Sequence, residues 1–315
     1  MTEVNNNIAV CLSTYNGERW LATMLDSVLP QLQLEGGLLY VRDDGSTDGT
    51  EALLSAYSSH PCLVLLHDQL GNLGVIGSFE LLLQSVEADY YILADQDDYW
   101  LPGKLASLLA LIRRAEVAVG GGAALVYSDL QVVDESGHEI SPSFWALQNL
   151  DPRWPECLEN VALQNVVPGC SMLFNRALRD LALPFPFETV MHDWWLLLVA
   201  AAHGSTAFLS EPCQAYRIHG TNTVGLHGGR TFWNRYRFGL LLENLRRALE
   251  QLAALFRRWP DLSGRFKKAS TLARFAELDC RQAVNVALRV QKRGVVRQYA
   301  TRFALMLMAL GCVRN

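Results

Sequence analysis

The sequence predicts an α/β fold in which a mostly parallel central sheet is flanked by helices. Short apolar runs alternate with segments of helical periodicity over the first hundred residues, and polar or glycine-rich turns separate them. This alternation is typical of βαβ units, which place consecutive strands in parallel. Acidic or polar side chains follow several of the apolar runs. Because ligands bind at the carboxyl ends of parallel strands, we expect these side chains to gather along one rim of the sheet.

Four short apolar runs predict buried strands over residues 8–13, 38–42, 63–66 and 90–94. Between them, apolar residues recur at helical spacing, which predicts helices over residues 18–29, 51–58 and 78–86. Beyond Lys104 the pattern is less regular, but further apolar runs indicate strands over residues 123–129, 169–174 and 208–211. A strongly apolar segment that follows two prolines predicts a helix over residues 192–202.

Charge divides the chain of 315 residues into two parts. Residues 1–229 carry 9 Lys and Arg against 27 Asp and Glu, a net charge of −18, whereas residues 230–315 carry 18 against 5, a net charge of +13. A glycine-rich stretch at residues 225–229 suits a hinge between the parts. We therefore expect one large domain over residues 1–225 and a basic helical region over residues 230–315.

The basic region allows two interpretations, because its aromatic and aliphatic residues are interleaved with Arg and Lys. Basic amphipathic helices suit an anionic membrane surface, where a lipid-linked substrate would also lie. Alternatively, the region is an ordinary helical subdomain whose arginine stems cover apolar surface. Nucleic acid is not expected as a partner, since the body carries −18. Whether the region forms a homo-oligomer contact is left open.

From the polar N-terminus and the scattered cysteines we expect a cytoplasmic protein, at most peripheral at the inner face of the membrane. Residues 1–7 lack the features of a signal peptide, and no apolar run reaches the ~20 residues of a membrane span. The seven cysteines are odd in number and form no CxxC pair. Neither a disulfide framework nor a zinc site is therefore expected.

The acidic cluster Asp95, Asp97 and Asp98 directly follows the fourth predicted strand. Three carboxylates within four residues repel one another unless a cation or hydrogen-bond donors neutralise them. Mg²⁺ or Mn²⁺ is commonly held by one or two carboxylates together with substrate phosphates, and such a cation stabilises a diphosphate leaving group. The alternative is a solvated acidic turn. Trp100 comes shortly after the cluster, and a large aromatic residue seldom ends an exposed turn. The solvated turn is therefore the less favoured alternative.

Two further strand ends carry polar groups that suit a nucleotide. Asp43 and Asp44 follow the second strand and can accept hydrogen bonds from a base or a ribose, although Asp44-Gly45 is also a turn signal. Thr14, Tyr15 and Asn16 end the first strand, on the same rim, where a ring and an amide can line a nucleotide pocket. Alternatively, the ring of Tyr15 is a packing residue.

The glycine-rich turn at residues 71–77 includes Asn72 and Gly74 and precedes a predicted helix. Its glycines lack the spacing of a dinucleotide-binding motif. A nearby phosphate remains compatible with such a turn at a helix start.

Asp193 stands at the start of the strongly apolar helix predicted over residues 192–202, beside His192, Trp194 and Trp195. An acid in a first helical turn is common and needs no functional explanation. In a pocket walled by indoles, however, a desolvated carboxylate has a raised pKa and can take a proton from a hydroxyl. One of the indoles would then pack on a sugar face.

Polar residues alternate in the segment that contains Arg217 and His219, which indicates an extended chain facing the site. Arg217 would bind a phosphate, and His219 would bind the metal. A hydrogen-bonded loop histidine is the alternative for His219.

Taken in order, these motifs resemble those of the bacterial family 2 glycosyltransferases, which have the Rossmann-like GT-A fold and invert the anomeric centre. The resemblance covers residues 8–225 and is carried by STYNGERWLATMLDS, VRDDGSTDGT, GNLGVIGSFE, YYILADQDDYW, VPGCSMLFNRAL, HDWWL and YRIHGTNTVG. Within that family the chain is most similar to rhamnosyltransferase-type members that build lipopolysaccharide O-antigen, core or capsule.

The resemblance implies a role for each motif. Asp97 is the expected principal metal ligand, and Asp95 lies near the ribose or diphosphate. His219 matches a position that contributes to metal or diphosphate binding. The acid that binds the nucleobase belongs to the pair Asp43 and Asp44, of which Asp44 is favoured, and Asp193 is the catalytic base. The remaining site residues are expected in the pocket for the acceptor and the sugar: Asp98, Trp100, Gly169, His192, Trp194, Trp195 and Arg217.

The expected reaction is transfer of a sugar from a nucleotide-sugar donor to a saccharide or lipid-linked saccharide acceptor, with Mg²⁺ or Mn²⁺ as cofactor. The resemblance favours dTDP-L-rhamnose as donor, and a UDP-hexose is the alternative. A metal-dependent nucleotidyltransferase has a similar sheet and acidic site. It usually has a basic glycine-rich loop near the N-terminus, whereas here only Arg19 stands near the first loop.

Overall fold

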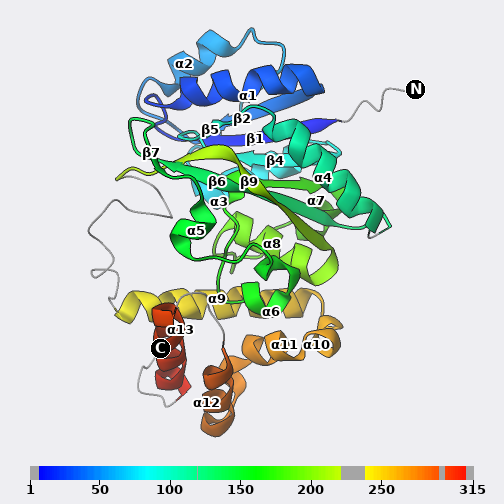
Figure 1. Ribbon diagram of the computed structural model, residues 1–315, viewed down its shortest axis with the longest axis vertical. Coiled ribbons are helices and arrows are strands. Elements are labelled where there is room, and N and C mark those ends of the chain that lie inside the picture. The colour runs from blue at the N-terminus through cyan, green and yellow to red at the C-terminus, as the bar shows by residue number, and fades with distance from the viewer. Residues whose placement is uncertain (1–6, 119, 221–237, 291–294, 310–315) are drawn as a thin grey trace.

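The computed structural model describes residues 7–118, 120–220, 238–290 and 295–309 (Figure 1). Its strands are β1 Ile8–Thr14, β2 Gly37–Asp43, β3 Leu63–Leu66, β4 Tyr90–Ala94, β5 Tyr99–Trp100, β6 Ala124–Val133, β7 Glu139–Ser141, β8 Met172–Asn175 and β9 Ser205–Arg217. In the described part of the chain they form one nine-stranded sheet in the order β3-β2-β1-β4-β8-β6-β9-β5, and β7 pairs with β6.

The sheet has a parallel half and a mixed half. Strands β3, β2, β1 and β4 run parallel, as the βαβ pattern predicts. Strand β8 then runs antiparallel to both β4 and β6, whereas β9 is parallel to β6. The predicted α/β class is confirmed, and the carboxyl ends of β1, β2 and β4 share one rim.

Helices cover both faces of the sheet, as Figure 1 shows. Alternate residues of β1 point to opposite faces, so that Val10 joins the core with α1 (Leu21–Glu35) and α4 (Lys104–Ala118). Cys11 joins the core on the other face, with α3 (Gly74–Ser85) and α8 (His192–His203). The remaining helices of residues 1–220 are α2 Thr50–Tyr57, α5 Phe144–Gln148, α6 Leu158–Val161 and α7 Arg176–Ala182, with 3-10 turns η1 Trp154–Glu156 and η2 Gly169–Ser171.

Several element bounds differ from the predicted ones. Helix α3 already begins at Gly74, within the stretch predicted as a turn. The segment predicted as a strand over residues 169–174 starts with η2, and the run at residues 208–211 is the middle of the long strand β9. Helix α4 was not predicted, although its residues Leu105, Leu108 and Ile112 are buried at helical spacing.

The basic C-terminal region is helical, as predicted, and packs below the sheet (Figure 1). Helix α9 (Phe238–Arg258) places Leu245, Leu252 and Leu255 in the same core as α8. The guanidinium of Arg258 donates to the carbonyl oxygens of the residues that follow α7 and lies over Trp259. The other elements are α10 Leu262–Arg265, α11 Lys267–Ala273, η3 Phe275–Glu277, α12 Cys280–Arg289 and α13 Val295–Ala309.

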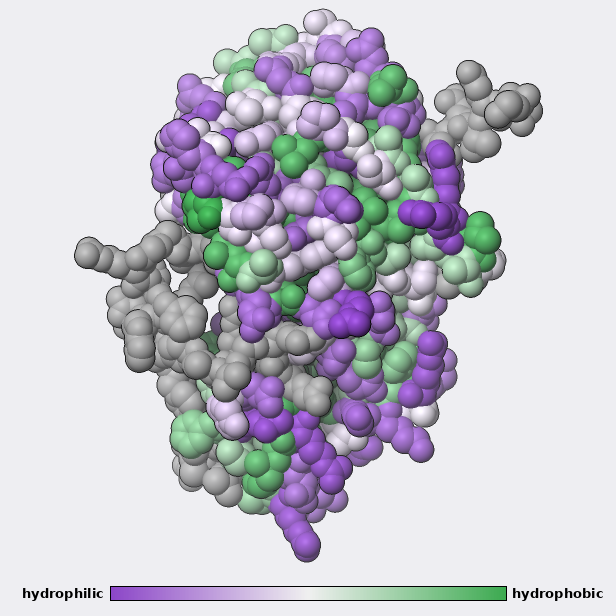
Figure 2. Space-filling model, viewed as in Figure 1, coloured by the Kyte–Doolittle hydropathy of each residue, from purple (hydrophilic) through white to green (hydrophobic). Residues whose placement is uncertain are grey.

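These contacts agree with a helical subdomain whose arginines partly serve packing, and an anionic membrane surface stays a prediction. The space-filling view shows hydrophilic and hydrophobic residues interspersed over this region (Figure 2). Among the described residues, no helix is both long enough and apolar enough to cross a bilayer. The predicted boundary at residues 225–229 lies outside the described residues.

Candidate active site

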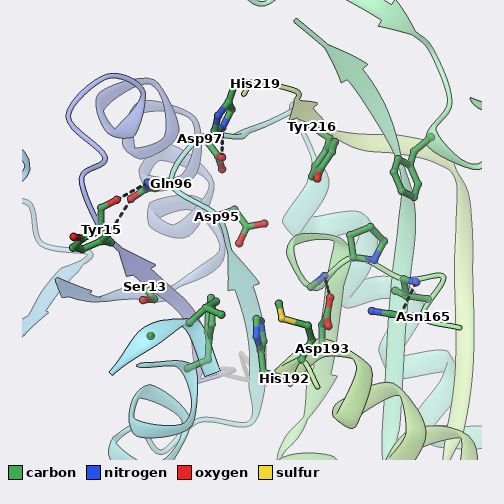
Figure 3. A pocket seen from close by; sticks show the side chains of 18 of the residues that line it. Ser13, Tyr15, Asp95, Gln96, Asp97, Asn165, His192, Asp193, Tyr216 and His219 are labelled. Atoms are coloured by element: carbon green, nitrogen blue, oxygen red, sulfur yellow. Dashed lines mark hydrogen bonds and ion pairs between the residues drawn. The ribbon is translucent and has the colours of Figure 1, made fainter. Parts of the chain in front are cut away.

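A cavity of about 840 Å³ opens at the rim formed by the ends of β1, β2 and β4 (Figure 3). Its first side comes from the parallel half of the sheet and is lined by Ser13, Tyr15, Asn16, Trp20, Asp44, Asn72, Gly74, Val75, Phe79, Asp95, Gln96 and Asp97. Its second side comes from α5, the loop before η2, the start of α8 and the end of β9, and is lined by Phe144, Gln148, Leu150, Gln164, Asn165, Val166, Val167, Pro168, Gly169, Met191, His192, Asp193, Tyr216 and His219.

Asp44 is a buried carboxylate at the end of β2, fixed by three donors. One oxygen accepts from the guanidinium of Arg42 and from the backbone N–H of Leu73 at 2.7 Å, and the other from the N–H of Gly74 at 2.9 Å. Arg42 is itself held by Asp68, at 2.8 Å. The start of α3 is thereby attached to β2. The arrangement fixes the Asp44 carboxylate at the wall of the cavity.

Asp43 and Thr14 lie beside the cavity but do not line it, which corrects the expectation that they contact the nucleotide. Asp43 accepts from the hydroxyl of Ser46 at 2.5 Å, as a turn-forming aspartate does. Thr14 is buried and donates its hydroxyl to Gln96 at 2.5 Å. The amide of Gln96 also binds both backbone groups of Tyr15, so that it joins the loop after β1 to the acidic cluster.

Asp95 and Asp97 face the cavity from the loop after β4. Burial, followed by the charge of Asp97, raises the pKa of Asp95 above its usual range. Asp97 Oδ2 lies 2.6 Å from Nε2 of His219, whose ring packs against Trp20 with centroids 4.3 Å apart. The two residues predicted as metal ligands therefore lie in contact, although 121 residues of chain separate them in the sequence.

Two groups of side chains are candidate ligands for the metal. One is Asp95, Asp98 and Cys170, and the other is Asp97 with His219. The oxygens and sulfur of Asp95, Asp98 and Cys170 all lie within 4.8 Å of one another. Burial raises the pKa of the Cys170 thiol well above its usual range, and a neutral thiol is a poor ligand for Mg²⁺ or Mn²⁺. Asp97 and His219 instead open into the cavity, where phosphate oxygens could complete the coordination. The donor set of Asp97, with Asp95 nearby, thus fits a hard divalent cation.

Asp98 does not line the cavity, which corrects its placement in the sugar pocket. The residue is 2% exposed, and its two oxygens accept from the amide of Gln214 at 2.5 Å and from the N–H of Arg217 at 2.9 Å. Gln214 in turn accepts from the ammonium of the buried Lys104, which also donates to the carbonyl of Cys170 at 2.7 Å. Asp98 therefore attaches the acidic loop to β9 through buried hydrogen bonds.

Asp193 lies at the start of α8 and lines the second side of the cavity. Its oxygens accept from the N–H of Gly169 at 3.0 Å and from the N–H of Trp194 at 2.6 Å. Burial raises the pKa of Asp193 to about 6, and the hydrogen bonds from Trp194 and Gly169 oppose this rise. A carboxylate with this pKa accepts a proton readily near neutral pH, which suits a general base.

The expectation that Trp194 and Trp195 wall this pocket is wrong. Helix α8 is buried on all sides, so both indoles enter the core and use their N–H groups there. Trp194 donates to the carbonyl of Val161 at 2.7 Å, and Trp195 donates to that of Ala182 at 2.9 Å.

Trp100 and Arg217 are likewise absent from the cavity lining, against expectation. Trp100 is 4% exposed, packs in the core with α1 and α4, and lies under the ammonium of Lys104. The guanidinium of Arg217 donates to the carbonyls of Asp97, Asp134 and Glu135. It orders the loop instead of facing a phosphate.

Much of the second side of the cavity was missed from the sequence. Amides and apolar groups from residues 144–168 dominate it, together with Tyr216, whose ring packs edge-on against Phe144. This segment has short helices and loops without a regular period, so no pattern pointed to it. Tyr216 precedes Arg217, which was expected in the site, but only the burial and orientation of Tyr216 show that it lines the cavity.

The sequence pattern of the family described as Glycosyl transferase family 2 matches residues 9–181, more than half of the chain. The chain belongs to this family. The predicted family is therefore confirmed. The matched range includes Asp44, Asp95 and Asp97, whereas Asp193 and His219 lie beyond its end.

Two relatives have names that specify different sugars. The dTDP-rhamnosyl transferase RfbG of Shigella flexneri is 23% identical over 68% of this chain and 73% of the relative. The UDP-Glc:alpha-D-GlcNAc-diphosphoundecaprenol beta-1,3-glucosyltransferase WfgD of Escherichia coli is 22% identical over 67% of this chain and 77% of the relative. Neither relative determines which nucleotide sugar this chain uses as donor.

Solved structures of glycosyltransferases share the fold. S. aureus TarS 1-349 in complex with UDP-GlcNAc superposes with a TM-score of 0.54 at 15% identity, covering 98% of this chain and 93% of that one. The mannosyltransferase PcManGT from Pyrobaculum calidifontis, in complex with GDP-Man and Mn²⁺, gives a TM-score of 0.55 at 16% identity, covering 98% and 88%. The predicted GT-A fold is thereby confirmed.

Proposed function

We propose that the protein is an inverting glycosyltransferase of bacterial surface-polysaccharide synthesis. It would move a sugar from a nucleotide-sugar donor to a saccharide or lipid-linked saccharide acceptor, with Mg²⁺ or Mn²⁺ bound at Asp97 and His219. One observation carries the proposal. The buried carboxylate of Asp193 and the acidic group Asp95 and Asp97 face a single cavity from its two sides (Figure 3).

The proposed reaction is one in-line displacement. Asp193 takes the proton of the acceptor hydroxyl, and the hydroxyl oxygen attacks the anomeric carbon of the donor. The bond from that carbon to the diphosphate oxygen breaks as the new glycosidic bond forms, so that the electron pair leaves with the nucleoside diphosphate. A divalent cation, when bound, neutralises the charge on this leaving group. Attack from the side opposite the diphosphate inverts the anomeric centre.

The residues of the first side would hold the nucleotide. Asp44 is an acceptor fixed for a base or ribose, and Tyr15 offers an exposed ring at the mouth of the cavity. Asn72 and Gly74 lie beside Asp44 and would contact the same part of the donor. Gly169 places its N–H on Asp193 and so supports the base.

For the donor we favour dTDP-L-rhamnose, and a UDP-hexose is the alternative. The similarity of the chain to RfbG supports the first, and its similarity to WfgD supports the second. The name of WfgD, which includes diphosphoundecaprenol, supports a lipid-linked acceptor.

A thermal-shift panel tests this proposal. The full chain is heated with dTDP-L-rhamnose, UDP-glucose or GDP-mannose, each with Mn²⁺, with Mg²⁺ or with EDTA. We expect the favoured donor at about 100 times its Kd to stabilise the protein by about 2.7 kcal/mol, and EDTA to remove that gain. If none of these donors raises Tm with either cation, the proposed function is wrong.

A further inference from the structure

His192 is a buried histidine at the start of α8, immediately before Asp193, and it lines the cavity. Its side chain stacks on the ring of Phe79, with centroids 4.1 Å apart and planes tilted by 21°. The residue is only 4% exposed. The imidazole is therefore fixed in place on an aromatic surface before any substrate arrives.

The ring has unused hydrogen-bonding capacity. Among the residues that the structure describes, Nδ1 of His192 has no hydrogen-bond partner although it is buried. Buried polar atoms nearly always have partners, and His192 also lines the cavity, so its ring is a candidate to bind a ligand there. Burial lowers the pKa of His192 to about 3. The ring is consequently neutral, with one N–H donor and one acceptor nitrogen, which are the two functions that a hydroxyl group can match.

The position of His192 places it on the donor side of Asp193. Phe79, on which it stacks, belongs to α3, the helix whose first N–H binds Asp44. Asp193 instead turns toward Gly169 and the loop that contains Asn165. In Figure 3, His192 lies between Ser13, on the first side of the cavity, and Asp193. A sugar attached to a nucleotide at Asp44 would extend toward this histidine.

We propose that His192 hydrogen-bonds a ring hydroxyl of the donor sugar and thereby determines which sugar is transferred. This inference rests on the proposed function. Val75, Phe79 and Met191, which line the same cavity, are apolar, so a second hydroxyl directed at them would lose its hydrogen bonds with water. The surroundings of His192 therefore fit a sugar edge that carries one hydroxyl beside an apolar carbon, as a deoxysugar does.

The test compares His192→Phe, which keeps a ring to stack on Phe79, with His192→Gln, which retains a donor and an acceptor. The matched control is His203→Phe. His203 lies at the other end of α8, packs against the ring of Trp259 at an interplanar angle of 59° and does not line the cavity. Binding of dTDP, dTDP-L-rhamnose, UDP and UDP-glucose is measured by calorimetry with Mn²⁺. Transfer is measured as kcat/KM with the nucleotide sugar that the wild type uses and with its singly deoxygenated derivatives.

We expect His192→Phe to weaken binding of that nucleotide sugar and lower kcat/KM by about 10- to 100-fold, while binding of the nucleotide alone changes less than about twofold. His192→Gln should recover part of the loss, and His203→Phe should behave as wild type. One deoxygenated donor should be as poor with the wild type as the parent donor is with His192→Phe.

Equal binding and turnover of the parent donor by the wild type and His192→Phe would overturn this role. So would a loss that appears equally with the nucleotide alone. A wild-type protein that binds no nucleotide sugar and transfers none would instead refute the proposed function, and the role of His192 with it.

Discussion

Asp44 and Asp193 are both buried carboxylates that accept backbone N–H groups at the start of a helix, yet their surroundings differ in one respect. Asp44, in the parallel half of the sheet, also contacts the guanidinium of Arg42. Asp193, beside the mixed half, has no such ion pair among the described residues, and burial raises its pKa to about 6. A cation beside a carboxylate stabilises its charge, whereas desolvation without one favours protonation.

This difference separates a binding group from a base. A carboxylate held by Arg42 and by two backbone N–H groups is fixed in place as a hydrogen-bond acceptor. A carboxylate whose pKa lies near neutral pH can take a proton and release it again. The following variants should separate the two halves of the cavity, one removing turnover and the other removing donor binding.

The largest effect is expected from Asp193→Asn. Without the base, kcat should fall by about 1,000-fold, while calorimetry should show donor binding within about twofold of wild type. The Asn oxygen can still accept from the N–H of Trp194, although the amide must turn from that of Gly169. Melting temperature checks the fold, and Asp180→Asn, which removes an exposed acid on α7 paired with Arg179, is the matched control. Near-normal turnover of Asp193→Asn would show that another group is the base.

A smaller loss is expected from Asp97→Ala, and here donor binding weakens, whereas Asp193→Asn leaves donor binding unchanged. It removes a metal ligand and the partner of His219, so binding of the nucleotide sugar with Mn²⁺ should weaken by about 100-fold and activity should fall with it. Binding of Mn²⁺ is followed by electron paramagnetic resonance. Unchanged Mn²⁺ affinity together with full activity in EDTA would contradict the metal role.

The smallest effect is a pH dependence, expected as about a tenfold loss of kcat/KM per pH unit below the pKa of Asp193. The base acts as a carboxylate, so activity is present above about pH 6 and falls as pH drops through that value. The residual activity of Asp193→Asn should lack this decline. Donor binding measured over the same pH range separates the base from the metal site. A decline centred near pH 4 would mean that burial does not raise this pKa.

The parallel half of the sheet was predictable because local pattern fixes position there. A strand that continues a βαβ series must end at the same rim as its neighbours, so Asp44 and Asp95 could be placed together from strand ends alone. The mixed half could not be predicted in this way. Strand β8 runs antiparallel between β4 and β6, and no local period in the sequence indicates its direction.

Side-chain direction was the second limit. The apolar helix α8 gave the position of Asp193, but a helix buried on all sides takes both Trp194 and Trp195 into the core. Arg217 was expected to face a phosphate, yet it reaches carbonyls of the turn at Asp134 and Glu135, more than 80 residues away in the sequence. Such pairings depend on tertiary packing and leave no signal in local sequence.

The buried network beneath the acidic loop has a mechanical consequence. Asp98 binds Gln214, Gln214 binds Lys104, and Lys104 binds the carbonyl of Cys170, the residue that follows Gly169. Gly169 in turn holds Asp193 through its N–H. These hydrogen bonds, joined by the backbone between Gly169 and Cys170, link the two sides of the cavity through the interior, so the acidic loop and the base should shift together. The spacing between leaving group and attacking oxygen would then be set by the interior of the protein before either substrate binds.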